Sequence, residues 1–178
     1  MTEVELTPEI FTADYVGGPG QRAFYLQLRG SFGTRSYELE KQQVSALADG
    51  LRELLTLVDA ADTINKTEPG RDPALALEPP DVVEWRIGTI GLAYDESSDR
   101  VLVLAQPVEL EADVEEPADP EQEADAHRFL LRRDQVRSFV LHTIAIVAEG
   151  RPVCQLCGLP IDPDGHNCPA SNGHRPAG

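Results

Sequence analysis

The feature that most constrains the fold of this chain is an amphipathic helical pattern over residues 43–59. Apolar side chains recur there at intervals of three and four, which places them on one face of a helix. They are Val44, Leu47, Ala48, Leu51, Leu54, Leu55 and Val58. A second helical pattern runs from an expected N-cap at Asp134 to about Ala148, with Gly150 as its stop signal. Its apolar face is wider, so we expect this second helix to be the more buried one.

Three candidate strands precede each helix, because short runs of β-branched, aromatic and aliphatic residues lie between turn signals. They cover residues 10–16, 24–29 and 35–39 before the first helix, and 85–94, 100–106 and 127–131 before the second. The strand-to-helix junctions also share a sequence match at a constant offset of 92 residues (131 minus 39): Leu39, Gln43 and Val44 match Leu131, Gln135 and Val136. The sequence therefore predicts an α+β protein built from pseudo-duplicated β-β-β-α units, with antiparallel strands covered by two helices on one face.

The expected domain organisation follows from this pattern and from the breaks in it. One α+β domain covers residues 1–150, and its halves are residues 8–60 and 82–150. The Pro- and Gly-rich stretch 66–81 is the predicted linker between the halves. Residues 109–125 form a predicted acidic loop, and residues 151–178 form a small zinc-binding tail.

The charge is strongly negative, with 31 acidic and 15 basic residues and a formal net charge of −16. The acidic loop alone carries nine carboxylates and no basic residue, so the remainder of the chain has 22 acidic residues (31 minus 9) against 15 basic ones. We expect this loop to be solvated and disordered, and its deletion to change the melting temperature by no more than about 3 °C. The alternative is that the acidic loop attracts and binds a basic partner.

The same charge makes nucleic acid an unfavourable partner, since proteins bind it largely by neutralising phosphates. The sequence contains no run of 18 apolar residues, and the N-terminus has no basic segment followed by an apolar one. We therefore expect a soluble, cytoplasmic protein that binds neither nucleic acid nor a membrane.

A metal site is predicted near the C-terminus, where all three cysteines of the chain lie within 15 residues of one another. Cys154, Cys157, His166 and Cys168 form the string Cys-x2-Cys-x8-His-x-Cys. Three thiolates and one imidazole make a complete tetrahedral set for a structural Zn²⁺ ion. His174 is a second candidate for the fourth ligand.

Other uses of these cysteines fit less well. A disulfide is disfavoured by the odd cysteine count and by a reducing cytoplasm. A redox Cys-x-x-Cys should open a helix, whereas this one enters a Pro- and Gly-rich tail, and a catalytic zinc site would keep one coordination position open. Redox chemistry, iron binding and thiols that bind nothing stay as minor alternatives.

A small-molecule site is a further possibility, with Arg22, Gln27, Lys41, Trp85 and Arg86 as candidate ligand-binding residues in a cleft between the halves. The glycine-rich string 17–22 could approach a phosphate, but a strand follows it instead of a helix, so a hairpin turn is the better interpretation. The chain has no Gly-x-Ser-x-Gly string and no Walker loop.

Four segments together resemble an uncharacterised actinobacterial family, domain of unknown function 3090. They are residues 17–27, 39–44, 84–89 and 154–169, and Ala170 stands where such proteins usually carry arginine. The resemblance implies no activity, because the family has none assigned. Genes of this family tend to lie near a gene for a predicted kinase-like protein, which the resemblance offers as a partner.

Two hypotheses about function follow. The favoured one is a non-enzymatic cytoplasmic module that binds another protein and uses the zinc tail as a rigid presentation surface. The alternative is a small-molecule-binding protein or enzyme with its site between the two halves. A deep pocket lined by the five candidate residues would favour the alternative, and a flat apolar patch beside the tail would favour the interaction module.

Overall fold

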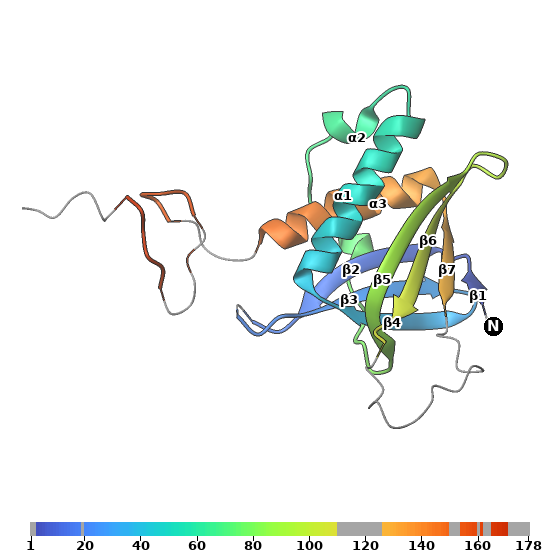
Figure 1. Ribbon diagram of the computed structural model, residues 1–178, viewed down its shortest axis with the longest axis horizontal. Coiled ribbons are helices and arrows are strands. Elements are labelled where there is room, and N and C mark those ends of the chain that lie inside the picture. The colour runs from blue at the N-terminus through green and yellow to red at the C-terminus, as the bar shows by residue number, and fades with distance from the viewer. Residues whose placement is uncertain are drawn as a thin grey trace, which may run out of the picture.

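Seven strands form one mixed sheet, in the order β1-β7-β6-β5-β4-β3-β2 (Figure 1). The computed structural model describes residues 3–18, 20–109, 126–149, 154–159, 161 and 165–170. The strands are β1 (Val4–Leu6), β2 (Ile10–Val16), β3 (Ala23–Gly30), β4 (Gly33–Leu39), β5 (Val83–Asp95), β6 (Arg100–Pro107) and β7 (His127–Leu131). The helices are α1 (Lys41–Val58), α2 (Thr63–Lys66) and α3 (Arg133–Ala148), with a 3-10 turn, η1, at Pro73–Leu75.

The α+β class is confirmed, as are the six expected strands and both long helices. The sequence did not predict β1 and α2, which are too short for a periodic pattern to register. Nearly all of the expected acidic loop, residues 110–125, lies outside the described residues, and so do Gly150 and His174.

The expectation of purely antiparallel strands is wrong. The pairs β2–β3, β3–β4, β5–β6 and β6–β7 are antiparallel, but β4 pairs with β5 and β1 pairs with β7 in parallel. Parallel neighbours need a connection that returns the chain to the same end of the sheet. The segment with α1 provides that connection between β4 and β5, a geometry that strand patterns alone do not specify.

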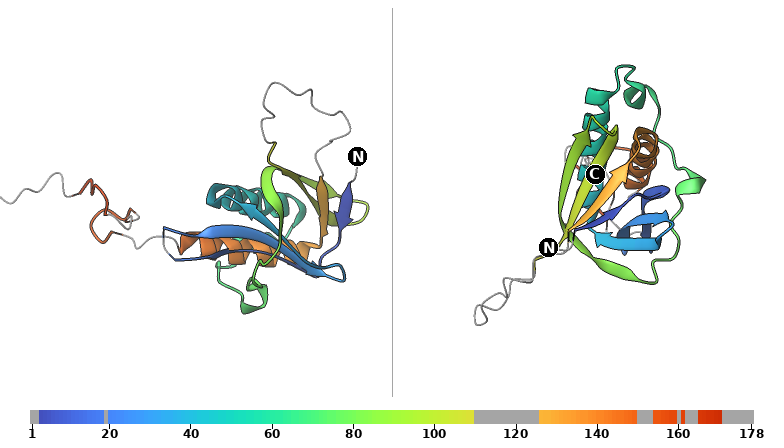
Figure 2. Two further views of the ribbon diagram at one scale, coloured as in Figure 1. Left: turned by 90° about the horizontal axis from the view of Figure 1, so that it is seen from below. Right: turned by 90° about the vertical axis from the view of Figure 1, so that its right-hand side faces the viewer.

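The sheet curls so strongly that strands far apart in its order touch across the interior (Figure 2). The hydroxyl of Tyr37 on β4 lies 2.7 Å from Nδ1 of His127 on β7, although β5 and β6 separate the two strands in the sheet. The ring of Phe11 on β2 lies 6.2 Å from that of Phe129 on β7. The concave face therefore encloses much of the core.

The two long helices contact each other and pack against this concave face. In α3 the ring of Phe139 lies 4.6 Å from that of Phe11, and the helix also buries His142 and Thr143 completely. Within the described residues, no helix is long and apolar enough to cross a bilayer.

The expected N-cap of α3 is shifted by two residues. Arg132 is the N-cap and Asp134 lies in the first turn of the helix. The cause is Gln135, whose Oε1 accepts a hydrogen bond from the backbone N–H of Arg132 at 2.9 Å and closes a capping box there. Gln43 closes the same box on Glu40 in α1, at 2.8 Å.

The expected linker packs over the convex side of β2 and β3. Thr12 donates a hydrogen bond to the carbonyl of Leu75 at 2.6 Å. Gln27 donates to the carbonyl of Glu78 at 3.0 Å and accepts from its N–H at 2.9 Å. The segment between the halves is thus a cover for the outer face of the first half.

Candidate metal centre

A tight turn starts the cluster of cysteines at the C-terminus. The N–H of Gly158 donates to the carbonyl of Cys154 at 2.9 Å, and the N–H of Cys154 donates to the carbonyl of Leu159 at 2.8 Å. Gly158 has φ of +72°, a left-handed conformation that glycine adopts without strain. The turn brings the thiols of Cys154 and Cys157 to one side of the backbone.

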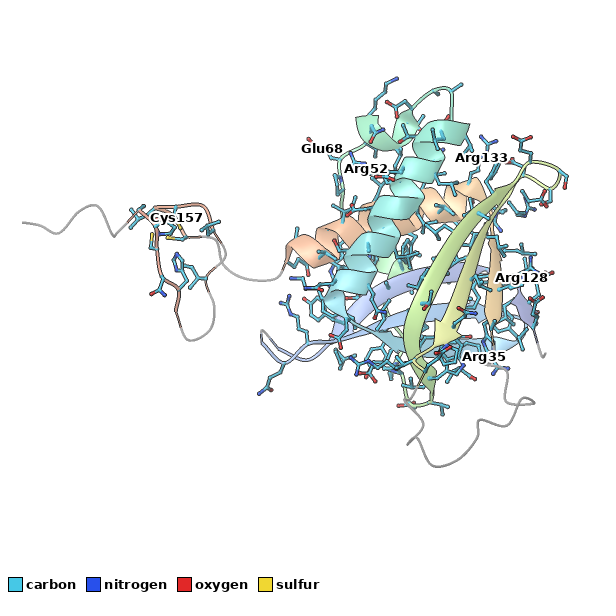
Figure 3. All side chains as sticks on the ribbon, viewed as in Figure 1. Arg35, Arg52, Glu68, Arg128, Arg133 and Cys157 are labelled. Atoms are coloured by element: carbon cyan, nitrogen blue, oxygen red, sulfur yellow. The ribbon has the colours of Figure 1, made fainter. Side chains whose placement is uncertain are left out.

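His166 and Cys168 complete a group of four ligand atoms that all lie within 4.8 Å of one another. The Sγ atoms of Cys154 and Cys168 are 3.8 Å apart, and Sγ of Cys157 is 3.3 Å from Nε2 of His166. Two sulfur ligands of a tetrahedral zinc ion lie about 3.8 Å apart when each Zn–S bond is about 2.3 Å. The cluster can therefore hold one metal ion, and Figure 3 labels Cys157, one of its four members.

The backbone favours the thiolate form that a metal ligand needs. The N–H groups of Cys157 and Leu156 are the main cause that lowers the pKa of Cys154 to about 7. For Cys157, the N–H of Leu159 acts in the same direction, but burial and the neighbouring Cys168 and Cys154 together raise its pKa. One thiol of the turn therefore ionises well before the other in the absence of a cation.

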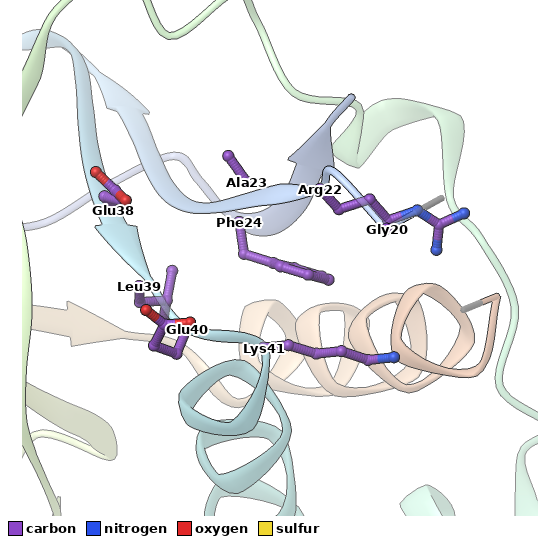
Figure 4. Close-up of a pocket in the computed structure, with 8 residues that line it drawn as sticks. All are labelled: Gly20, Arg22, Ala23, Phe24, Glu38, Leu39, Glu40 and Lys41. Carbon is purple, nitrogen blue, oxygen red and sulfur yellow. The ribbon is translucent and has the colours of Figure 1, made fainter. Parts of the chain in front are cut away.

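The five candidate ligand-binding residues are not gathered into one site. Arg22 and Lys41 line a pocket of about 350 Å³ beside Phe24 (Figure 4). Trp85 and Arg86 line a different hollow of about 790 Å³ at the start of β5. These two hollows share one lining residue, Glu40, which forms an ion pair with Arg86.

The remaining candidate, Gln27, is fully buried beneath the linker and binds Ser36 and Glu78, so its contacts are structural. Arg22 also has a structural contact, because its Nη1 donates to the carbonyl of Glu149 at 3.0 Å and its guanidinium lies 4.0 Å from the ring centre of Tyr15. The glycine-rich string before Arg22 connects β2 to β3, as the hairpin interpretation predicts.

Sequence reasoning missed a polar network that joins β2, the linker and the end of α3. Arg71 donates two hydrogen bonds to Asp14, at 2.9 and 3.2 Å, and two to Glu149, at 3.0 and 3.1 Å. Nδ1 of the fully buried His142 accepts from the N–H of Asp72 at 2.9 Å. These residues are scattered along the chain, and the only sequence signal is the acidic residue within the β2 pattern.

Comparison with known proteins identifies a family. No curated protein and no solved structure gives a significant match to this chain. The model of one family, DUF3090, described as "Protein of unknown function", matches residues 6–168. The matched region runs from the end of β1 to Cys168 and so includes all four residues of the cluster. The chain therefore belongs to the DUF3090 family.

Proposed function

We propose that this chain is a cytoplasmic zinc-binding protein whose C-terminal tail, folded around one structural Zn²⁺ ion, serves as a non-enzymatic module for binding another protein. The observation that carries the proposal is the convergence of Cys154, Cys157, His166 and Cys168 to within 4.8 Å. Soft thiolates with one imidazole favour zinc over hard cations such as Mg²⁺ or Ca²⁺. Four protein ligands occupy every position of a tetrahedron, which favours a structural role over a catalytic one.

The protein-binding role is supported by two leucines on the metal turn. Leu156 is 75% exposed and Leu159 is 48% exposed, although each lies within two residues of a ligand. A coordinated metal would hold these apolar side chains in fixed positions, which reduces the entropy lost when a partner binds them. The kinase-like protein offered by the family resemblance is the first partner to test.

Metal content tests the zinc site directly. Purified, reduced protein should contain about one zinc per chain by elemental analysis, and Cys157→Ser should lose it because only three ligands remain. Gln155→Ser, which changes an exposed neighbour of the ligands, is the matched control and should keep the metal. Zinc-free protein, or zinc retained by Cys157→Ser, would overturn this assignment.

Binding is tested by affinity capture with the intact, metal-loaded protein as bait, followed by direct titration with any captured candidate. Leu156→Asp should weaken the interaction, because it places a charge at the centre of the proposed contact. Leu57→Asp is the control, since Leu57 is 87% exposed on α1, outside the tail. Equal binding by both variants would exclude the tail as the interface.

We also propose that the fold arose by internal duplication. The support is the shared order of three strands and a helix, with the same capping box at Gln43 and Gln135. Two tyrosines near the ends of the first strand of each half, β2 and β5, give further support. The hydroxyl of Tyr15 donates to the carboxylate of Glu149 at 3.1 Å, and that of Tyr94 donates to the carboxylate of Asp99 at 2.6 Å. Alignment of the two halves across many family members should reveal the repeat, and its absence would leave only a resemblance of shape.

One observation favours a small-molecule site as a second candidate function. Arg22 and Lys41 bring two cationic groups to one pocket, and Lys41 forms no ion pair with any residue that the structure describes (Figure 4). A small anion would suit them. Calorimetric titration with anionic metabolites, compared between wild type and Lys41→Met, tests this candidate, and equal heats would reject it.

A further inference from the structure

Access to solvent differs among the four members of the metal cluster. Cys154 and Cys168 are buried, at 8% and 9% exposed, whereas Cys157 and His166 are half-buried. Both chain neighbours of Cys157 are exposed as well. Solvent therefore reaches the sulfur of Cys157 more easily than the sulfur of either other cysteine.

Once an ion is bound, access and hydrogen bonding decide which sulfur reacts, because a coordinating thiol is deprotonated outright and all three cysteines are then thiolates. A thiolate is oxidised more readily when it is exposed, and hydrogen bonds to the sulfur draw charge away from it. The sulfur of Cys154 accepts such bonds from the N–H groups of Leu156 and Cys157, and that of Cys157 accepts from the N–H of Leu159. Exposure and hydrogen bonding both favour Cys157 over Cys154 as the reactive sulfur.

A second thiolate lies close enough to trap an oxidised sulfur. The sulfur atoms of Cys154, Cys157 and Cys168 all lie within 4.8 Å of one another. A disulfide holds its two sulfur atoms about 2.05 Å apart, so a shift of less than about 3 Å joins Cys157 to either neighbour. The chain contains no other cysteine, so a disulfide within one chain can form only in this cluster.

We propose that the metal-loaded tail is a peroxide-sensitive switch, in which hydrogen peroxide oxidises Cys157, a disulfide forms and the ion leaves. In the first step the Cys157 thiolate attacks one peroxide oxygen. The S–O bond forms and the O–O bond breaks, so the sulfur loses two electrons and the peroxide gains them, leaving a sulfenic acid and hydroxide. In the second step the thiolate of Cys154 or Cys168 attacks that sulfur, the S–S bond forms, and the S–O bond breaks to release a second hydroxide. Each hydroxide takes a proton from solvent and becomes water.

The oxidation releases the ion because it removes two of the four ligands. The remaining thiolate and His166 fill only half of a tetrahedron, and such a site binds zinc far more weakly. Leu156 and Leu159 then lose the fixed positions that the proposed function requires. Reduction of the disulfide restores the ligands, so the switch is reversible. This inference rests on the zinc site proposed above and adds regulation to it.

Treatment of the intact, zinc-loaded chain with hydrogen peroxide tests the switch. We expect about one zinc per chain to be released, measured with a colorimetric chelator, and the chain to lose two hydrogens in mass spectrometry. A 1,3-dione that alkylates sulfenic acids should label Cys157, and peptide mapping should place the disulfide between Cys157 and either Cys154 or Cys168. A thiol reductant with added zinc should reverse the oxidation. A disulfide or a label that excludes Cys157, or irreversible addition of oxygen to the sulfurs, would overturn the proposal.

Two histidine variants separate the point of attack from metal binding. Cys157→His and Cys154→His each leave two thiolates and two imidazoles, a set that also holds zinc. Cys157→His keeps only the two buried thiolates, so it should release zinc at least about tenfold more slowly than wild type under peroxide. Cys154→His keeps the accessible thiolate and should release zinc at close to the wild-type rate. Equal rates for the two variants would assign the attack to another sulfur and overturn the proposal.

Zinc content before treatment distinguishes failure of the site from failure of the switch. If the wild-type chain holds no zinc, the metal site fails and the switch fails with it. Zinc that stays bound in a large excess of peroxide would reject the switch alone. Where a histidine variant does not bind zinc, the label on Cys157 of the wild-type chain decides the point of attack.

Discussion

Gln43 and Gln135 make the same kinds of contact at the starts of α1 and α3. Each side-chain oxygen accepts a hydrogen bond from the N-cap backbone, and each side-chain nitrogen donates to two consecutive carbonyls of another segment. The carbonyls belong to Ile87 and Gly88, at 3.0 and 3.2 Å from Gln43, and to Pro8 and Glu9, at 2.8 and 3.0 Å from Gln135. Each glutamine thus ties a helix start to a neighbouring length of chain.

Removal of either amide should destabilise the fold. We expect Gln135→Ala to cost about 2–3 kcal/mol and Gln43→Ala about 1–2 kcal/mol. Gln135 is the more buried, and its loss leaves the carbonyl of the buried residue Pro8 without this donor. Urea unfolding measures both values. Gln42→Ala is the control. Gln42 is exposed on α1 beside Gln43, so this substitution should change the free energy of unfolding by less than about 0.5 kcal/mol. Losses no larger than the control's would show that the amides are dispensable.

Arg71 should stabilise the attachment of the linker. Arg71→Met removes four hydrogen bonds and leaves the Asp14 carboxylate, whose side chain is only 6% exposed, without its cation. We expect the free energy of unfolding to fall by about 1–2 kcal/mol. This is a small value for charged hydrogen bonds, because the arginine side chain is 42% exposed to solvent. Arg52→Met, which removes an exposed arginine on α1 (Figure 3), should be nearly neutral. Adding Asp14→Asn to Arg71→Met should restore part of the loss, and a further loss would contradict this account.

His142 should make stability depend on pH in the mildly acidic range. Burial lowers the pKa of His142 below its ordinary value of 6.5, so the unfolded chain binds the proton more tightly than the folded one. Stability should therefore fall as pH falls below about 6.5, with a slope of at most about 1.4 kcal/mol per pH unit from this group. Protonation would also remove the lone pair of Nδ1 that accepts the N–H of Asp72.

The pH dependence is measured by urea unfolding between pH 5 and 7. His142→Gln keeps an acceptor for Asp72 but does not titrate, so the slope should flatten by the contribution of His142. The surrounding charged groups, Asp14, Arg71, Asp72 and Glu149, remain in both proteins. An unchanged slope in this variant would assign the effect to those groups instead.

Periodicity predicted the elements of the fold well because each long element carries its own pattern. The faces of α1 and α3 and the alternation in β6 are local properties. The metal string is local too, with four ligand residues within 15 positions. The parallel pairing of β4 with β5 was not predictable, because the direction of β5 depends on where the chain returns after α1.

Sites whose residues come together only in the folded chain were missed, or their residues were wrongly expected to form one site. Trp85 and Arg22 line different hollows, because Trp85 lies on β5 and Arg22 directly precedes β3, and β4 separates these two strands in the sheet. The contact between His127 and Tyr37 was not predictable either, because the two residues are 90 positions apart in the chain and meet across the core. Gln27 was a candidate ligand-binding residue for a cleft between the halves, but in the folded chain its side-chain amide is hydrogen-bonded to Glu78 of the linker.

Removal of the metal should disrupt the tail and leave the body folded. The apolar core draws on both halves, from Phe11 on β2 to Ile146 on α3, and among the described residues it includes none from the tail. Chelation should therefore leave the far-UV circular dichroism of α1 and α3 largely unchanged. Protease cleavage after residue 150 should become faster, because a short tail with few apolar residues cannot keep its turns without the ion.

The matched control is Cys157→Ser, which should show the fast cleavage even with zinc present, whereas Gln155→Ser should resist cleavage until a chelator is added. Collapse of the helical signal on chelation would instead mean that the ion supports the whole fold, and a tail that resists protease without metal would mean that its turns hold by themselves.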